Sequence, residues 1–226
     1  MIFRVLGPQP GARKPATLLA VLLLHANAWV SLDELIEHIW QEQDVPPSAG
    51  HNVRTYVWQW RRALPPGRID TRSRTYRLRV EPGDTDADVA RDLLDRAARG
   101  PAAQAVEPLT AALDLWRGRP FAELRHEVAA PEAARLDDLR WEVRERLADA
   151  WTALGRHGEA IAVLRALIAE DPLREGAWAR LVRALSRAGR RANALVEYRR
   201  VCDLLAAELG VAPGPELLRA RREVAA

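Results

Sequence analysis

A repeat with a period of 34 residues constrains the fold of this 226-residue chain more than any other feature. Gly155 recurs 34 residues later as Gly189. Ala160, five residues after the first glycine, recurs as Ala194. A small residue at a turn and another in the next helix are typical of helical hairpins that pack closely. Because one hairpin cannot bury its apolar face alone, the copies are expected to stack on each other.

Other positions assign the repeat to a known type. Trp151 and Trp178 fall where a tetratricopeptide repeat usually carries its aromatic residues. A partial third copy, Gly100 and Ala105, has the same five-residue spacing but is out of phase. We therefore expect residues 84–226 to form a tetratricopeptide-like, all-α domain.

A polar turn at residues 81–84 separates the repeats from an N-terminal part with a different pattern. Alternation, proline positions and apolar periodicity predict both strands and helices there. The expected elements are a strand at 1–6, helices at 14–26, 31–40 and 48–64, and strands at 69–72 and 75–80. This order is that of a winged helix-turn-helix. The predicted fold class is therefore mainly α, with a winged helix-turn-helix DNA-binding domain at 1–80 and the helical-repeat domain at 84–226.

The start of the second helix has a clear signal. Ser31 is a favourable N-cap residue, and Glu34 three residues later completes a capping box. The residues that would form the apolar face of this helix are Leu32, Leu35, Ile36 and Ile39.

The third helix has two different faces. At 100° per residue, its buried stripe is predicted to consist of Val53, Val57, Trp60 and Leu64. The opposite face carries cationic and hydrogen-bonding side chains, which suit the donor and acceptor pattern of the DNA major groove. An ordinary amphipathic surface helix with solvated arginines would show the same pattern.

The hairpin after this helix favours the DNA-binding interpretation. It holds five arginines within twelve residues, with Asp70 as the only nearby acid. Strand alternation places Arg77 and Arg79 on one face, so we expect a wing whose unpaired arginines contact phosphates. Residues 1–80 carry 11 basic and 6 acidic side chains, against 23 and 25 in the remainder. The DNA-binding candidates are His51, Arg54, Thr55, Trp58, Arg61, Arg62, Arg72, Arg74 and Arg77.

Other chemistry has little support in the sequence. The five histidines are dispersed and no motif matches a metal site or a phosphate-binding loop, so no metal, no cofactor and no enzymatic activity are expected. The single Cys202 fits a reducing, cytoplasmic location. The longest apolar run, residues 18–24, is too short to span a membrane.

Several ordered motifs resemble one family of regulators. They are LGP at 6–8, VSLDELI at 30–36, PPSA at 46–49, LDLWRG at 113–118 and LAAELGVAP at 205–213. Together they resemble the SARP-type antibiotic-regulatory activators across essentially the whole chain. That family joins an OmpR-type winged helix to a tetratricopeptide-like bacterial transcriptional activation domain. Only residues 7–13 stand where family members usually have a longer N-terminal sheet.

The resemblance implies a function and its partners. SARP-type proteins activate biosynthetic gene clusters by binding direct repeats in double-stranded DNA near promoters and helping to recruit RNA polymerase. By the same resemblance, Gln43, Asp44 and Val45 would contact polymerase, and the chain would be a homodimer on DNA, with no membrane partner. The alternative is a tetratricopeptide-type protein-interaction adaptor whose winged helix is degenerate.

Overall fold

The computed structural model describes residues 13–41 and 43–225, so the strand predicted at 1–6 lies outside the described residues. The chain divides into two compact units. Unit 1 comprises the described residues up to Val89 together with Leu115–Asp137, and unit 2 comprises Ala90–Asp114 and the residues from Asp138 onward.

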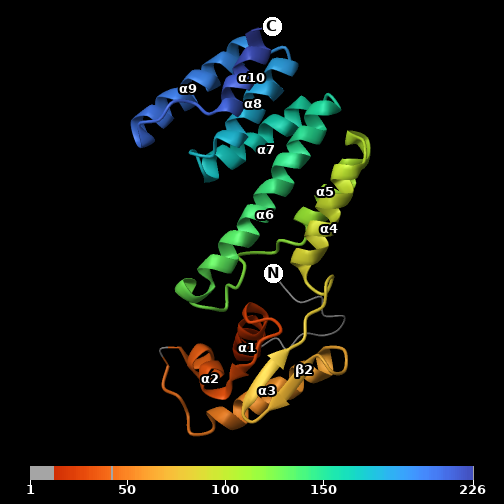
Figure 1. The fold of residues 1–226 in the computed structure, drawn as a ribbon, viewed down its shortest axis with the longest axis vertical. Helices are drawn as coiled ribbons and strands as arrows, with labels where there is room; N and C mark the ends of the chain where they lie inside the picture. Colours follow the sequence, from red (N-terminus) through yellow and green to blue (C-terminus); the bar gives the residue numbers. More distant parts are fainter. Residues whose placement is uncertain (1–12, 42, 226) are drawn as a thin grey trace. The chain divides into compact units, whose positions relative to one another are not determined.

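The described residues of unit 1 form three complete helices and a small sheet (Figure 1). Its complete elements are α1 (Arg13–Leu24), β1 (Val30–Ser31), α2 (Leu32–Trp40), α3 (Ala49–Ala63), β2 (Ile69–Arg72) and β3 (Thr75–Leu78). It also holds the first residues of α4 (Asp86–Arg99) and of α6 (His126–Ala153). Helix α1 packs against α2, α3 and β3. The apolar side chains of α1 are therefore the centre of this core, with Leu18 and Leu22 fully buried.

A segment from beyond the polar turn joins the same core. Phe121, Leu124 and Leu136 are buried and cluster with the apolar residues of α1, α2 and α3. Nearby, the Gln41 side-chain amide donates to the Glu123 carbonyl at 3.2 Å. Apolar burial and this hydrogen bond hold residues 115–137 in unit 1.

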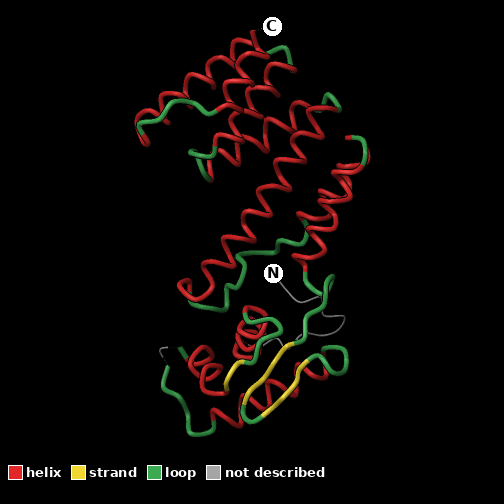
Figure 2. Tube along the Cα trace, viewed as in Figure 1, coloured by secondary structure: helices red, strands yellow, loops and turns green. Residues whose placement is uncertain are grey.

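The sheet of unit 1 has the antiparallel order β1–β3–β2, with Val30 opposite Tyr76 and Asp70 opposite Arg77 (Figure 2). Strand β1 was not predicted, because two residues are too few to show alternation. The β2–β3 turn has left-handed φ angles at Ser73 (43°) and Arg74 (63°). Two positive φ values match the right-handed twist of a tight two-residue hairpin.

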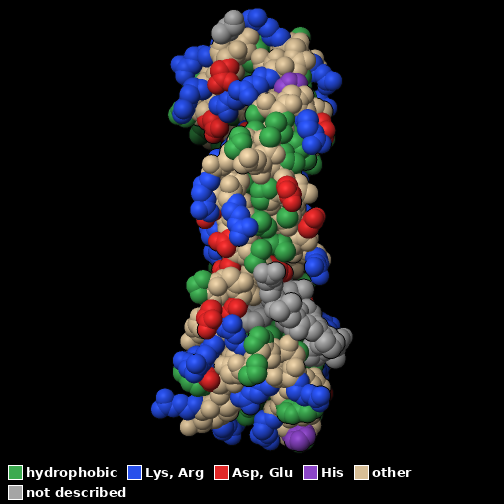
Figure 3. Space-filling view, turned by 90° about the vertical axis from the view of Figure 1, so that its right-hand side faces the viewer, with side chains coloured by type: hydrophobic (Ala, Val, Ile, Leu, Met, Phe, Trp, Pro, Cys, Tyr) green, Lys and Arg blue, Asp and Glu red, His purple; other side chains and the backbone are tan. Residues whose placement is uncertain are grey.

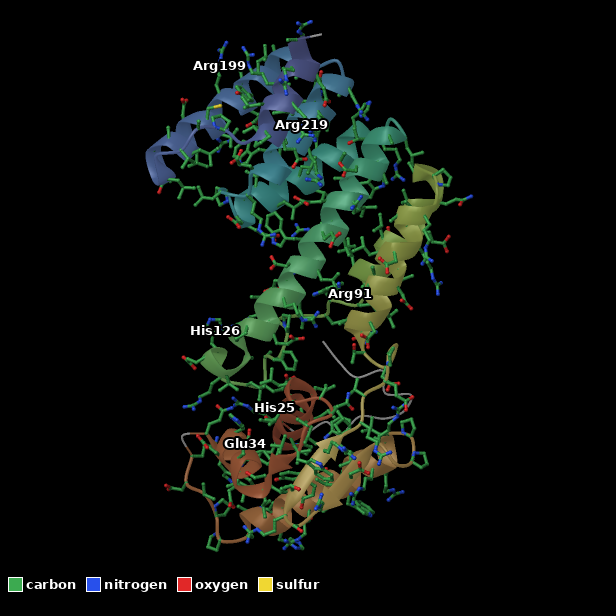
Figure 4. The ribbon with its side chains drawn as sticks, viewed as in Figure 1. His25, Glu34, Arg91, His126, Arg199 and Arg219 are labelled. Carbon is green, nitrogen blue, oxygen red and sulfur yellow. The ribbon has the colours of Figure 1, made fainter. Side chains whose placement is uncertain are left out.

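Two polar contacts fix the start of α2. The Ser31 hydroxyl accepts a hydrogen bond from the Glu34 amide at 3.1 Å, which confirms the predicted N-cap. The Glu34 carboxylate faces the imidazole of His25, at the end of α1, with 3.6 Å between Nε2 and Oε1 (Figure 4). The chain therefore enters α2 at a defined angle relative to α1.

Unit 2 is helical throughout. Besides the remainders of α4 and α6, its helices are α5 (Ala102–Leu113), α7 (His157–Glu170), α8 (Glu175–Arg187), α9 (Arg191–Leu209) and α10 (Pro215–Ala225). Helix α8 packs against α7, α9 and α10 and is the most buried helix of this unit, with Trp178 and Leu181 in the core. None of the helices described is long and apolar enough to cross a membrane.

The 34-residue repeat is confirmed by the backbone. Gly155 and Gly189 end α6 and α8 with nearly equal left-handed φ angles of 74° and 73°. In each turn the next amide donates to the carbonyl five residues earlier, at 2.8 and 2.9 Å. This is the helix-ending arrangement that favours glycine. The second small residues, Ala160 and Ala194, are fully buried. The partial copy at Gly100 also lies between two helices, but its φ is not left-handed.

Candidate nucleic-acid interface

Helix α3 has the two faces predicted from its sequence. Val53, Val57 and Trp60 are at most 2% exposed, which confirms the buried stripe. The Trp60 indole N–H donates to the Pro15 carbonyl at 2.7 Å and so attaches α3 to α1. Because the inner face is fixed by packing and by this hydrogen bond, the outer face has a defined orientation.

The outer face of α3 brings together four of the nine candidates, which are exposed: His51, Arg54, Trp58 and Arg62. The helix has no acidic residue. Within residues 13–41 and 43–225, neither Arg54 nor Arg62 has a carboxylate partner. This face therefore presents positive charge that an anionic partner can use.

An exposed tryptophan lies in the middle of this face. Trp58 is 55% exposed, and the Arg62 guanidinium carbon lies 4.9 Å from its ring centroid. The two residues are one helical turn apart, so the contact is local to α3. Stacking on the ring restricts the rotamers of Arg62 while leaving its N–H donors free.

Two further candidates on α3 make internal hydrogen bonds. The Arg61 guanidinium donates to the Ile69 carbonyl at 2.8 and 3.1 Å and to the Thr71 hydroxyl at 2.7 Å. Arg61 thereby ties α3 to β2, and the two elements lie side by side (Figures 1 and 2). Thr55 is half-buried, and its hydroxyl donates to the His51 carbonyl at 3.2 Å.

The expectation of unpaired arginines in the wing is wrong for four of the five. Asp70 Oδ2 lies 2.7 Å from both Arg77 and Arg79. The partners of the other two come from different segments, since Arg68 pairs with Asp84 at 2.7 Å and Arg74 with Asp33 at 3.2 Å. These acids are absent from the hairpin itself, so a count of neighbouring residues could not include them. Among the described residues, Arg72 alone of the five has no carboxylate partner, and its side chain is exposed.

Asp70 binds two arginines, one in β3 and one just after it, on the outer face of the sheet. Hydrogen bonds from Arg77 and then from Arg79 lower the pKa of Asp70 below its usual value, because they stabilise the carboxylate. The Arg77 guanidinium also stacks on Trp29, 4.6 Å from the ring centroid. Arg77 is therefore held against the sheet rather than extended into solvent.

The tip of the wing lies at the start of α2. The Leu32 amide donates to the Arg74 carbonyl at 2.8 Å. The exposed side chains of Arg74 and Asp33 form an ion pair beside this hydrogen bond. Sequence reasoning missed Asp33 as part of the site. The available signal was its place in the first turn of α2, beside the predicted helix-turn-helix.

The loop between α2 and α3 holds the three predicted polymerase-contact residues. Gln43, Asp44 and Val45 are all exposed, and Val45 is one of the exposed large apolar side chains of the chain. On the face of unit 1 that Figure 3 shows (its lower part), several patches of Lys and Arg side chains are visible, with fewer Asp and Glu side chains among them. In the part of the chain that the structure describes, no group of three or more His, Cys, Asp or Glu is placed to hold a metal ion.

Family models match both parts of the chain. Residues 10–78 match the family "Transcriptional regulatory protein, C terminal", and residues 85–225 match the "Bacterial transcriptional activator domain". The chain therefore belongs to the bacterial transcriptional regulators that combine these two domains. The resemblance to SARP-type activators is thereby confirmed, as is the mainly helical fold class.

Individual relatives in this family align along almost the whole chain. The regulatory protein AfsR of Streptomyces griseus is 34% identical over 98% of this chain and 24% of its own length. The regulatory protein DnrI of Streptomyces peucetius is 32% identical over 92% of this chain and 82% of its own. A solved structure, Mycobacterium tuberculosis EmbR in complex with a low affinity phosphopeptide, matches with a TM-score of 0.78 and 31% identity, over 96% of this chain and 60% of that one. The chain thus spans about a quarter of AfsR.

Proposed function

We propose that this transcriptional regulator is a sequence-specific DNA-binding activator that inserts α3 into the major groove. The observation that carries the proposal is the outer face of α3, which combines exposed His51, Arg54, Trp58 and Arg62 and no acidic residue. The major groove distinguishes all four base pairs by donors, acceptors and the thymine methyl group. A rigidly packed helix with two arginines that have no carboxylate partner among the described residues matches that chemistry.

The candidate residues divide into those that would contact bases and those that would contact phosphates or hold the domain together. Arg54 and Arg62 would donate in pairs to guanine O6 and N7, and Trp58 would pack on a thymine methyl or a sugar. Thr55 and His51 lie beside them on the same helix. At the wing, Arg72 and Arg74 would contact phosphates. Arg61 and Arg77 would contact DNA at the edge of the interface. Their internal hydrogen bonds would also hold α3 against β2 and β2 against β3.

The family supports a wider role for the rest of the chain. In this proposal residues 1–80 bind DNA, and residues 84–226 hold a second copy of the chain on neighbouring direct repeats. The exposed loop residues Gln43, Asp44 and Val45 would contact RNA polymerase at the promoter of a biosynthetic gene cluster. Because the target is genomic DNA, the activity would take place in the bacterial cytoplasm.

Binding selection on random-sequence duplexes tests the proposal. We expect enrichment of a repeated motif whose half-sites lie about one helical turn apart. Arg54→Ala should weaken binding to the selected site about tenfold or more, since a bidentate contact to guanine contributes about 1–3 kcal/mol of discrimination. Arg199→Ala, at an exposed position on α9, is the matched control and should have no effect. If no sequence is enriched, the adaptor alternative replaces the activator.

A further inference from the structure

A groove of about 760 Å³ lies in unit 2 between α7, α8 and α9. Its floor is apolar and includes Ile168, Trp178, Leu181 and Leu204. Trp178 is 2% exposed, and its indole N–H donates to the Pro172 carbonyl at 2.8 Å. Because this hydrogen bond satisfies the polar atom of the indole and fixes its ring, the floor is preformed.

The exposed charged side chains on the rim of the groove are positive. The Arg165 and Arg200 side chains are 56% and 71% exposed, whereas the Glu197 side chain between them is 15% exposed. Glu197 lies 3.7 Å from Arg165 and 3.6 Å from Arg200. These separations exceed the roughly 2.7–2.9 Å of a charge-assisted hydrogen bond. Both guanidiniums therefore retain donors that a closer anion can engage.

We propose that this groove binds an amphipathic organic anion, a small molecule with an apolar body and a carboxylate, phosphate or sulfonate group. The apolar body would lie on Ala169 and Leu204, and the anionic group would bridge Arg165 and Arg200. The Arg200 guanidinium, 5.6 Å from the Trp178 ring centroid, already lies over the floor. Apolar walls with a few convergent polar groups are typical of small-molecule sites.

The size of the groove favours a small molecule over a protein segment. Its volume falls within the range of roughly 300–1,000 Å³ that is typical of ligand pockets. Nine described residues line it, whereas a standard protein interface uses about 20–30 residues on each side.

The first test uses two dyes that differ only by a sulfonate group. 1-Anilinonaphthalene-8-sulfonate carries the proposed anionic group, and 1-anilinonaphthalene lacks it. The full chain is titrated with each dye and fluorescence is recorded. We expect one saturable site for the sulfonate and at least about tenfold weaker binding of the neutral dye, since a hydrogen bond to a charged group contributes about 1.5–3 kcal/mol. Equal affinities would overturn the proposal.

Neighbouring arginines provide a matched pair of variants. Arg200 lines the groove, whereas Arg199 does not and projects from the side of α9 away from α7 (Figure 4). Arg200→Ala should weaken sulfonate binding about tenfold, and Arg199→Ala should leave it unchanged. Equal effects of the two substitutions would show that the dye binds elsewhere and would overturn the proposal. Circular dichroism verifies that both variants remain folded.

A gain of binding tests the same site without depending on a loss. Glu197→Gln removes the carboxylate that shares the two arginines and should raise sulfonate affinity about two- to fivefold, as expected for a partly exposed ion pair. A weaker affinity in this variant would contradict the proposal. The occupant would instead be a protein segment if an acidic, leucine-containing peptide binds the groove while the sulfonate does not.

Discussion

Helix α3 and the wing are both rich in arginine, yet the structure uses these arginines differently. In the wing, four of five are paired with Asp33, Asp70 or Asp84. On α3, Arg54 and Arg62 have no acidic partner among the described residues, and Arg61 binds a carbonyl and a hydroxyl. The number of arginines in a segment therefore does not measure the positive charge that it presents to DNA.

The difference follows from where acidic side chains can reach. Strand pairing places Asp70 directly opposite Arg77, and the wing tip lies against the first turn of α2, which carries Asp33. The outer face of α3 points to solvent from a helix without acids. We infer that α3 provides most of the sequence-specific affinity for DNA and that the wing mainly positions the domain on the DNA backbone.

The largest expected effect separates two adjacent arginines of α3. Arg62→Ala should weaken binding to the selected site about ten- to a hundredfold with little change in stability, because Arg62 is exposed and its guanidinium donates no hydrogen bond to any other described residue. Arg61→Ala should lower the free energy of unfolding by about 1–2 kcal/mol, because it removes the bonds to Ile69 and Thr71. Fluorescence anisotropy and urea unfolding measure the two quantities.

The reverse order would break the comparison. If Arg61→Ala weakened DNA binding more than Arg62→Ala in protein that remains folded, the free outer face of α3 would not be the main reader.

A smaller effect is expected at the wing tip. Asp33→Asn removes the partner of Arg74 and a negative charge near the phosphates, so DNA affinity should rise a few-fold. Because Asp33 competes with phosphate for the Arg74 guanidinium in the wild type, the slope of log affinity against log salt should steepen by up to about 0.9 in the variant. Glu37→Gln, at an exposed position on the same helix, makes the same charge change away from the wing and is the control. Equal gains in the two variants would mean that Arg74 is not specifically released.

The smallest expected effect is a pH dependence of stability. Its arginine partners lower the pKa of Asp70 in the folded state, so its stabilising contribution is present above the ordinary aspartate pKa. That contribution is lost as the pH falls through the lowered pKa. The stability difference between the wild type and Asp70→Asn should therefore be larger at pH 7 than at pH 3, measured by urea unfolding. A difference independent of pH would assign the effect of Asp70 to packing.

Elements with many local signals were predictable. The buried stripe of α3 follows from helical periodicity, and Val53, Val57 and Trp60 are buried as expected. The repeated turns at Gly155 and Gly189 also follow from the sequence, because few residues other than glycine readily adopt a left-handed φ at a helix end. Strand β1 was not predictable, since its two residues become a strand only by pairing with β3.

The sequence by itself determined the order of the helices and of the β2–β3 hairpin in the N-terminal part, the faces of α3 and the helical repeat, because each depends on residues within a few turns of one another. Only the tertiary structure decided which arginines have an acidic partner among the described residues. Asp33 meets Arg74 across 41 positions in the chain, and Asp84 meets Arg68 across 16. The groove between α7, α8 and α9 likewise exists only when three helices pack. Ion pairing and cavity shape depend on distances in space, which periodicity along a chain does not encode.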